Sequence, residues 1–176
     1  MTSKLQAGQA FPEIHVKTTN GETLQLGHPK NGADWQMVVV YRGRHCPLCT
    51  QFLNELETYR EEFLKTGVDL MAVSADSLDQ LQDHEPKLQV GFPLAYGLTE
   101  EQMKKLGVYI SHPRSEQETD HKFSEPALFV VNTDSKLYVV DYSNNPFVRP
   151  ELGALARGLK WIRDPKNNYP IRGTAN

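Results

Sequence analysis

Two cysteines, Cys46 and Cys49, are the residues of this chain whose type and spacing most directly indicate chemistry. They lie three positions apart in the run Arg-His-Cys-Pro-Leu-Cys, and the 176 residues contain no other cysteine. Two thiols at this separation at the start of a helix can close a disulfide within one turn, and the first can be held partly as thiolate, the reactive form. The pair therefore predicts thiol–disulfide chemistry.

The surroundings of the first cysteine favour its ionised form. At the start of a helix the free N–H groups and the positive end of the dipole favour a negative charge. Arg42, Arg44 and His45 lie just upstream and could add positive charge. Such settings bring a thiol pKa into a range of roughly 3.5–7.5. Because Cys49 lies one turn further in, we expect Cys46 to attack and Cys49 to resolve the mixed disulfide.

Other interpretations of the cysteine pair stay open. A Cys-x-x-Cys pair is half of a zinc site, but a closed structural site needs four ligands, so two of the six histidines would have to join it from distant segments. The cysteines could also be inert core residues, or the chain a non-enzymatic redox-sensing or binding module. We favour redox chemistry, because a close pair in a cytosolic protein is more often redox-active or metal-binding than structural. His84, His112 and His121 stand in polar stretches, and we expect no role for them.

Composition excludes several classes of function. Hydrophobic residues make up 39% of the chain and charged residues 23%, as in ordinary soluble domains. The formal net charge of −3 indicates neither a nucleic-acid partner nor an anionic membrane. The first ten residues do not form a signal peptide, and no apolar run approaches the ~18 residues of a membrane helix. We expect one cytoplasmic domain over residues 1–176, with no cofactor and no metal.

The elements before and after the pair are predicted from periodicity. Residues 11–17 alternate apolar and polar side chains, Asn20-Gly21 follows, and Leu24 and Leu26 resume the alternation, which predicts a β-hairpin. Residues 37–41 form a continuous apolar run typical of a central strand buried on both faces. An apolar stripe then begins near Pro47 and predicts a helix that ends at Gly67.

The rest of the chain alternates strands and helices. The pattern predicts strands at 68–73 and 91–95, helices at 77–88 and 99–107, an exposed loop at 111–124, a hairpin over 127–132 and 137–142, and a last helix from Pro150. Together these elements predict an α/β fold with a central mixed sheet flanked by helices and an N-terminal β-hairpin extension. A strand, a cysteine pair at a helix start and a later hairpin backed by a helix form the thioredoxin arrangement.

The run Val-Val-Tyr-Arg-Gly-Arg-His-Cys-Pro-Leu-Cys-Thr at residues 39–50 resembles the peroxiredoxin-like branch of the alkyl hydroperoxide reductase/thiol-specific antioxidant superfamily. Residues 124–129 and 168–173 share the resemblance, which covers nearly the whole chain. It implies a thioredoxin-like fold and an antioxidant oxidoreductase that reduces peroxides or disulfides. It further implies a thiol reductant, such as a thioredoxin or glutathione system, and is compatible with a homodimer.

The chain departs from the family motif, Pro-x-x-x-Thr-x-x-Cys, in ways that bear on mechanism. On that motif Cys49 takes the place of the peroxide-attacking cysteine, Cys46 replaces the threonine and Arg42 replaces the proline. Pro126 stands near the place of the family's activating arginine and resembles the cis-proline of thioredoxins, which faces the cysteine pair. Arg42 or Arg149 would then have to compensate. The resemblance makes Cys49 attack and Cys46 resolve, the reverse of the order that the helix start favours, and both orders stay open.

Overall fold

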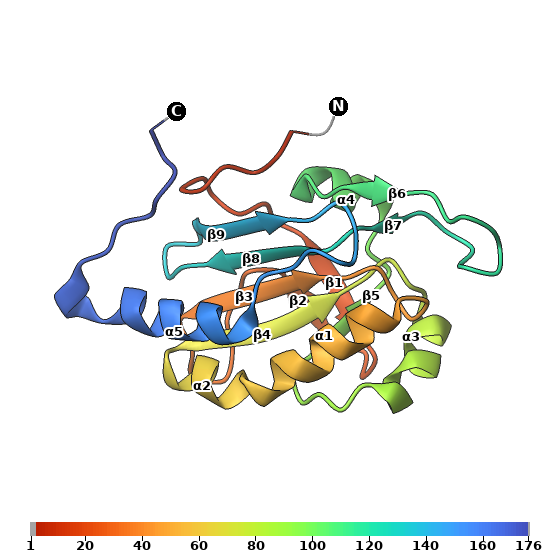
Figure 1. The fold of residues 1–176 in the computed structure, drawn as a ribbon, viewed down its shortest axis with the longest axis horizontal. Coiled ribbons are helices and arrows are strands. Elements are labelled where there is room, and N and C mark those ends of the chain that lie inside the picture. Colours follow the sequence, from red (N-terminus) through yellow and green to blue (C-terminus); the bar gives the residue numbers. More distant parts are fainter. Residues whose placement is uncertain (1–2, 176) are drawn as a thin grey trace.

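The computed structural model describes residues 3–175 and is organised around a seven-stranded mixed sheet (Figure 1). The strands follow the spatial order β2 (Thr23–Gln25), β1 (His15–Thr18), β5 (Leu94–Tyr96), β4 (Val68–Val73), β3 (Trp35–Val40), β8 (Ala127–Val131) and β9 (Leu137–Tyr142). The β3–β4 and β4–β5 pairs are parallel, and the other neighbours are antiparallel. The predicted fold class is confirmed, including the N-terminal hairpin β1–β2.

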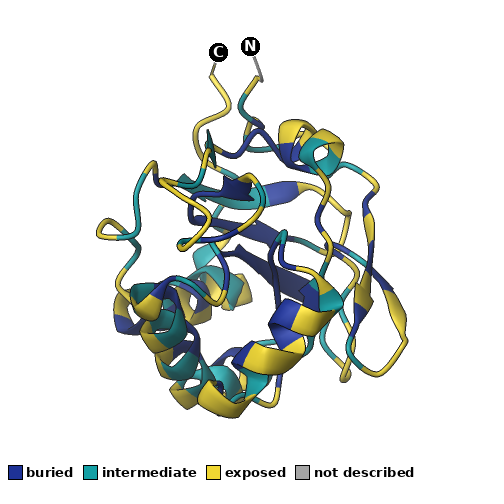
Figure 2. Cartoon of the chain, turned by 90° about the vertical axis from the view of Figure 1, so that its right-hand side faces the viewer, coloured by how far each residue is buried: buried dark blue, intermediate teal, exposed yellow. Residues whose placement is uncertain are grey.

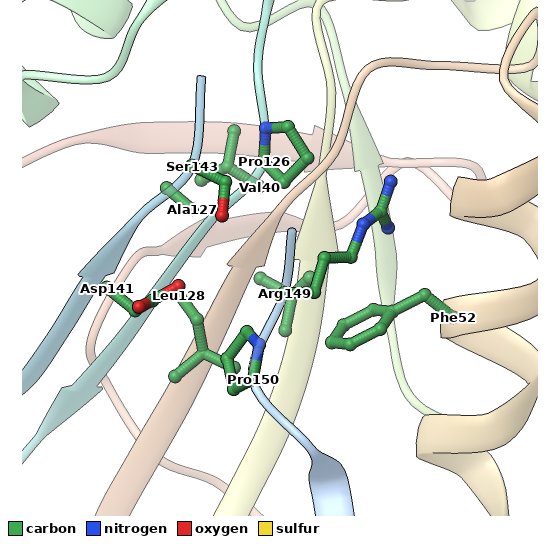
Figure 3. A pocket seen from close by; sticks show the side chains of 10 residues that line it. Val40, Phe52, Pro126, Ala127, Leu128, Asp141, Ser143, Arg149 and Pro150 are labelled. Carbon is green, nitrogen blue, oxygen red and sulfur yellow. The ribbon is translucent and has the colours of Figure 1, made fainter. Parts of the chain in front are cut away.

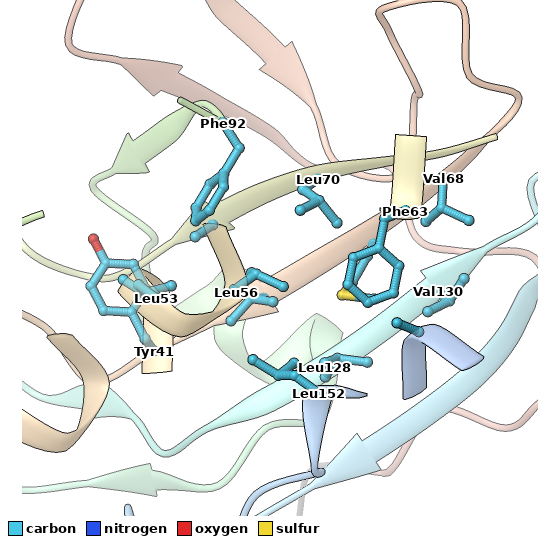
Figure 4. Packing of buried hydrophobic residues seen from close by; sticks show 14 of the residues in the cluster. Tyr41, Leu53, Leu56, Phe63, Val68, Leu70, Phe92, Leu128, Val130 and Leu152 are labelled. Atoms are coloured by element: carbon cyan, nitrogen blue, oxygen red, sulfur yellow. The ribbon is translucent and has the colours of Figure 1, made fainter. Parts of the chain in front are cut away.

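Helices and loops cover both faces of this sheet. One face packs against α1 (Pro47–Thr58), α2 (Arg60–Lys65) and α5 (Leu152–Arg163), whose buried side chains include Leu53, Phe63 and Leu159 (Figures 1 and 4). The opposite face carries α4 (Glu100–Leu106). The short helices α3 (Leu78–His84), η1 (Glu85–Lys87) and η2 (Pro165–Asn167) complete the chain. The outer surfaces of the helices are largely exposed, whereas the central strands β3, β4 and β8 are buried along their whole length (Figure 2).

Strand β3 shows why a continuous apolar run is needed at the centre. Met37 and Val39 contribute to the core under α1 and α5, whereas Val38 and Val40 contribute to the core on the other side. Because successive side chains of a strand point to opposite faces, both alternating sets must be apolar when both faces are covered. The strand ends just before the cysteine motif, so the motif lies at the carboxyl end of a central strand.

Two boundaries differ from the expected helices. The single helix expected from Pro47 to Gly67 is broken at Tyr59, whose N–H bonds the carbonyl of Leu56 three residues back, while the hydroxyl of Thr58 donates to the carbonyl of Glu55 at 2.6 Å. Such local bonds tighten the turn and end α1. The last helix begins at Leu152 rather than Pro150, because the Glu151 carboxylate caps it by accepting backbone N–H groups.

The segment expected to be an exposed loop at 111–124 is partly structured. Strand β6 (Ile110–Ser111) pairs antiparallel with β7 (Phe123–Ser124) at its two ends. Phe123 and Ser124 are fully buried. The sequence did not predict this pairing, because the residues between the two strands are polar and a two-residue strand is too short to show a periodic pattern. Among residues 3–175, none of the helices is both long and apolar enough to cross a membrane.

Gly107 ends α4 and offers a direct test of the packing of the N-terminal segment. It has a φ of +73°, and an added Cβ would lie 2.6 Å from the Ser3 carbonyl oxygen. We expect Gly107→Ala to lower the free energy of unfolding by about 2–4 kcal/mol, measured by urea unfolding. Gly21→Ala is the matched control, because Gly21 has a φ of +82° but open space around it, so its loss should be only about 1 kcal/mol. Equal losses at both positions would contradict the packing.

Candidate active site

Both cysteines lie at the start of α1, as the sequence predicts. Cys46 is the N-cap residue, with extended backbone, and its sulfur accepts the N–H of Cys49 at 3.3 Å. An N-cap side chain normally satisfies one of the free N–H groups of the first helical turn, and a thiolate does so with a full negative charge. Both residues are free thiols, 2% and 0% exposed, so the sulfurs are in contact with protein rather than bulk water.

The turn between β3 and α1, residues 43–46, is the active-site turn. The N–H of Cys46 donates to the Gly43 carbonyl at 3.2 Å, and the N–H of Arg44 donates to the Asp76 carboxylate at 2.8 Å. Gly43 has a φ of +137°, and a Cβ there would lie 2.5 Å from an Asp76 oxygen. Only glycine therefore allows the turn to approach the carboxylate so closely.

Arg149 comes from the connection between β9 and α5, a hundred residues along the chain, and meets both thiols. Its guanidinium Nη2 lies 2.9 Å from the sulfur of Cys49 and 3.9 Å from that of Cys46. The guanidinium also packs over the ring of Phe52, 5.1 Å from the ring centroid. The structure thus brings Arg149, expected from the sequence to support the pair, into direct contact with it.

Arg42 approaches the pair from the other side and is held by a carboxylate that the sequence did not single out. Its Nε lies 3.1 Å from Glu125, which is almost fully buried and also accepts a hydrogen bond from Ser111 at 2.7 Å. The Arg42 guanidinium stacks on Phe123 at 4.7 Å and is one of the groups that lower the pKa of Cys46. The only sequence signal for Glu125 is an acidic residue directly before a proline and a buried strand.

His45 and Pro126 are the two other residues expected to support the cysteine pair. The His45 ring packs edge-on against Phe123, 4.5 Å between centroids, and burial followed by the charge of Arg42 lowers its pKa, so the ring is neutral at pH 7. No peptide bond among residues 3–175 is cis, so the likeness of Pro126 to a cis-proline is wrong. The extended backbone from β7 into β8 is held there by the N–H of Ser143, which donates to the Pro126 carbonyl at 2.9 Å.

Pro126 instead lines a small pocket beside Arg149 (Figure 3). Its walls are mostly apolar, from Val39, Val40, Phe52, Pro126, Ala127, Leu128 and Pro150, with Asp141, Ser143 and Arg149 as the polar groups. The space in which the centre of a water molecule fits is about 10 Å³, which is about one water.

The two thiols differ sharply in acidity. The pKa of Cys46 is lowered to about 6, first by a hydrogen bond from the Cys49 thiol, and then by the N–H of Cys49, Arg42 and Arg149. Burial raises the pKa of Cys49, and the negative charge of Cys46 raises it further. Arg149 lies nearer to Cys49 and by itself would favour charge there, but burial opposes it more strongly. The first proton lost by this coupled pair therefore leaves the charge on Cys46.

Metal binding was the main alternative chemistry for the pair. Within residues 3–175, no group of three or more His, Cys, Asp or Glu side chains lies close enough together to hold a metal ion.

Comparison with known proteins shows what this chain is similar to. A 1-Cys peroxiredoxin of Medicago truncatula is 27% identical over 140 residues, covering 76% of this chain and 62% of that protein. The chain thus spans about three fifths of the length of the curated relatives it matches.

Among solved structures, a cysteine-to-serine mutant of peroxiredoxin 6 from Arenicola marina has a TM-score of 0.75 at 19% identity and covers 92% of this chain and 75% of that one. Mycobacterium tuberculosis AhpC has a TM-score of 0.72 at 15% identity, covering 93% and 96%. These likenesses show the fold. The model of the AhpC/TSA family matches residues 7–140, about three quarters of the sequence, and the chain belongs to this family.

Proposed function

We propose that the chain is a thiol-dependent peroxidase in which Cys46 attacks a hydroperoxide and Cys49 resolves the product. The observation that carries the proposal is the asymmetric dithiol: Cys46 is ionised near neutral pH, Cys49 keeps its proton, and Arg149 contacts both sulfurs. A thiolate is the nucleophile in such chemistry, and a neighbouring protonated thiol is poised to follow it.

The electrons and atoms balance over two steps. The Cys46 thiolate attacks the terminal oxygen of ROOH, the O–O bond breaks, and RO⁻ takes up a proton and leaves as ROH, which gives Cys46 sulfenic acid. The Cys49 thiol then displaces the sulfenic hydroxyl, releasing water and forming the Cys46–Cys49 disulfide. Two equivalents of an external thiol reduce the disulfide, and the reductant leaves as its own disulfide.

The two arginines supply the charge stabilisation that this reaction needs. Negative charge moves from sulfur to the departing oxygen as the O–O bond breaks, so fixed cations beside both positions favour the transition state. Arg42 is held by Glu125 at 3.1 Å, and Arg149 lies at 3.9 Å and 2.9 Å from the two sulfurs. Because these guanidiniums are fixed before the substrate arrives, little reorganisation accompanies the reaction.

Family membership supports the same chemistry, and the second cysteine adds to it. The Medicago truncatula relative is called a 1-Cys peroxiredoxin, whereas this chain has a second thiol one helical turn from the first. A resolving cysteine within the same turn removes the need for one from another chain. We further propose a thioredoxin- or glutathione-type thiol as electron donor, a cytoplasmic location, a single domain, and a homodimer as the assembly to be tested.

One contact supports the alternative order, in which Cys49 attacks the peroxide first. Arg149 lies 2.9 Å from the sulfur of Cys49, closer than to Cys46, and Cys49 holds the attacking position of the family motif. In that order Cys49 forms the sulfenic acid and Cys46 resolves it, and the disulfide product is the same.

Trapping the sulfenic acid separates the two orders. Each single variant, Cys46→Ser and Cys49→Ser, is mixed with one equivalent of hydrogen peroxide and dimedone, and the adduct is located by mass spectrometry. We expect rapid labelling of Cys46 in Cys49→Ser and little in Cys46→Ser, while the wild type loses two thiols per peroxide without an adduct. Labelling only in Cys46→Ser supports the alternative order. Reaction no faster than free cysteine in all three proteins contradicts the proposed function.

A further inference from the structure

A charged pair lies behind the active-site turn and plays no part in the chemistry described so far. Asp76, in the connection between β4 and α3, has a fully buried side chain. His121 comes from the polar segment between β6 and β7, and its Nε2 lies 3.3 Å from the Asp76 Oδ1. A carboxylate with no exposed surface is costly unless a cation accompanies it, and His121 is the histidine placed to do so.

The Asp76 carboxylate joins this histidine to the turn that carries Cys46. Its second oxygen, Oδ2, accepts the Arg44 N–H at 2.8 Å, two residues before Cys46. The carboxylate also lies so close to Gly43 that no Cβ fits between them. One side chain therefore holds the backbone of the active-site turn on one side and faces His121 on the other.

His121 is itself held from several directions. Its Nδ1 lies 2.8 Å from Asp120, and Asp120 accepts a second hydrogen bond from Gln80 of α3 at 2.8 Å. Thr119, which is buried, lies 3.2 Å from the same ring nitrogen. The imidazole ring thus bridges two carboxylates from different segments, an arrangement that favours its charged form.

We propose that Asp76 and His121 are positioning residues for Cys46: as a charged pair they hold the active-site turn so that the Cys46 sulfur stays at the N-terminus of α1. The inference rests on the proposed function in that it takes Cys46 as the reacting thiol. It assigns a role to His121, for which the sequence suggested none.

Loss of the His121 charge changes the pKa of Cys46 in two ways, and both act in the same direction. The Asp76 carboxylate becomes an uncompensated negative charge near the turn, which disfavours a second negative charge on the sulfur. The turn also loses part of its support, so the sulfur leaves the N–H groups that stabilise the thiolate. Both effects raise the pKa of Cys46.

The Asp76–His121 pair is charged on both sides only while His121 is protonated. The contact with the Asp76 carboxylate, and then the hydrogen bond with Asp120, raise the pKa of His121 above its ordinary 6.5. The cation is therefore complete below pH 6.5 and is lost as pH rises through the higher folded-state value. The other titratable groups that face the pair are Tyr41, His45 and His84, and burial lowers the pKa of both of these histidines, which keeps them neutral. The Arg44 guanidinium instead pairs with Asp83.

The test is a direct titration of the Cys46 thiolate by its absorbance at 240 nm in the reduced, full-length protein. For His121→Gln we expect the midpoint to rise from about 6 to about 7, with alkylation by iodoacetamide at pH 6 slowed about three- to tenfold. His121→Arg, which restores the cation, should return both values to those of the wild type. The matched control is His112→Gln, which alters an exposed histidine of the same segment.

Asp76→Asn provides an independent test, because the amide oxygen of the new side chain can still accept the Arg44 N–H while the negative charge of the carboxylate is removed. We expect a smaller rise in the Cys46 midpoint in this variant than in His121→Gln, because the turn loses the ion pair but no uncompensated carboxylate is left beside it, and we expect no further change when His121→Gln is added. If His121→Gln and His112→Gln titrate alike, or if the double variant shows the full rise, the inference is overturned. A wild type with no thiol titrating near pH 6 would instead overturn the proposed function, so the two failures are distinguishable.

Discussion

An Arg149→Met variant should reduce hydrogen peroxide roughly 10²–10³-fold more slowly than the wild type, the loss seen when one fixed donor is removed from a charge-stabilising site. Arg149 contacts both sulfurs, at 2.9 Å and 3.9 Å, and methionine keeps an apolar stem against Phe52 while removing the charge. The same substitution should raise the pKa of Cys46, because Arg149 is one of the groups that lower it. Stopped-flow peroxide consumption and thiolate absorbance measure the two effects.

Arg157→Met is the matched control for this substitution. Arg157 lies on α5, is largely exposed and makes only a 3.8 Å ion pair with Glu151, so its removal should leave both the rate and the thiol titration unchanged. If Arg149→Met reduced peroxide as fast as Arg157→Met does, Arg149 would have no part in the reaction and its contact with the sulfurs would be structural only.

The contribution of Cys46 to the stability of the reduced protein should increase as pH rises from about 6 to 9. The pKa of Cys46 is lowered from 9.0 to about 6 on folding, so between these values the unfolded chain binds a proton that the native state has released. A group of this kind stabilises the fold fully above its unfolded pKa and loses that contribution as pH falls through the folded one. The gain is at most about 4 kcal/mol, three steps of 1.36 kcal/mol each. The raised pKa of Cys49 opposes any further gain above pH 9.

Urea unfolding of the wild type and of Cys46→Ser, both kept reduced, measures this contribution. Serine retains the N-cap hydrogen bond but does not ionise, so its unfolding free energy should change less between pH 6 and 8.5 than that of the wild type. The difference between the two proteins isolates the thiol from all other titrating groups. Parallel pH profiles would mean that Cys46 has a similar pKa in the folded and unfolded states.

Several parts of this protein follow from the sequence alone, because they depend on neighbours along the chain. The apolar run that forms β3, the Asn-Gly turn between β1 and β2, and the cysteine pair at the start of α1 are all local patterns. The side-chain period, the turn residues and helix capping each depend on residues only a few positions apart. The elements that they produce can therefore be predicted from the sequence. The position of Cys46 at a helix N-terminus, which makes it the more acidic thiol, belongs to this group.

The features that were predicted wrongly from the sequence depend on local backbone hydrogen bonds and backbone geometry. The break at Tyr59 depends on local hydrogen bonds that interrupt an otherwise continuous apolar stripe. Pro126 follows a trans peptide bond, and its carbonyl accepts the N–H of Ser143, the residue after β9. Neither the helix break nor the proline geometry produces a periodic pattern in the sequence. For Pro126 the prediction depended on the resemblance to a known motif, and that resemblance was misleading.

The chemical surroundings of the thiols were decided by the tertiary structure. Arg149 reaches them from a hundred residues away, Arg42 is fixed by Glu125 across 83 positions, and His121 joins Asp76 behind the active-site turn. These charged groups meet because the sheet order places β4, β3, β8 and β9 side by side. The segments that follow β4, β3 and β9 then lie at the same end of the sheet as the segment that precedes β8. The sequence by itself determined that two thiols would lie at a helix N-terminus. The charges that set their acidity depend on distances through space, which spacing along the chain does not encode.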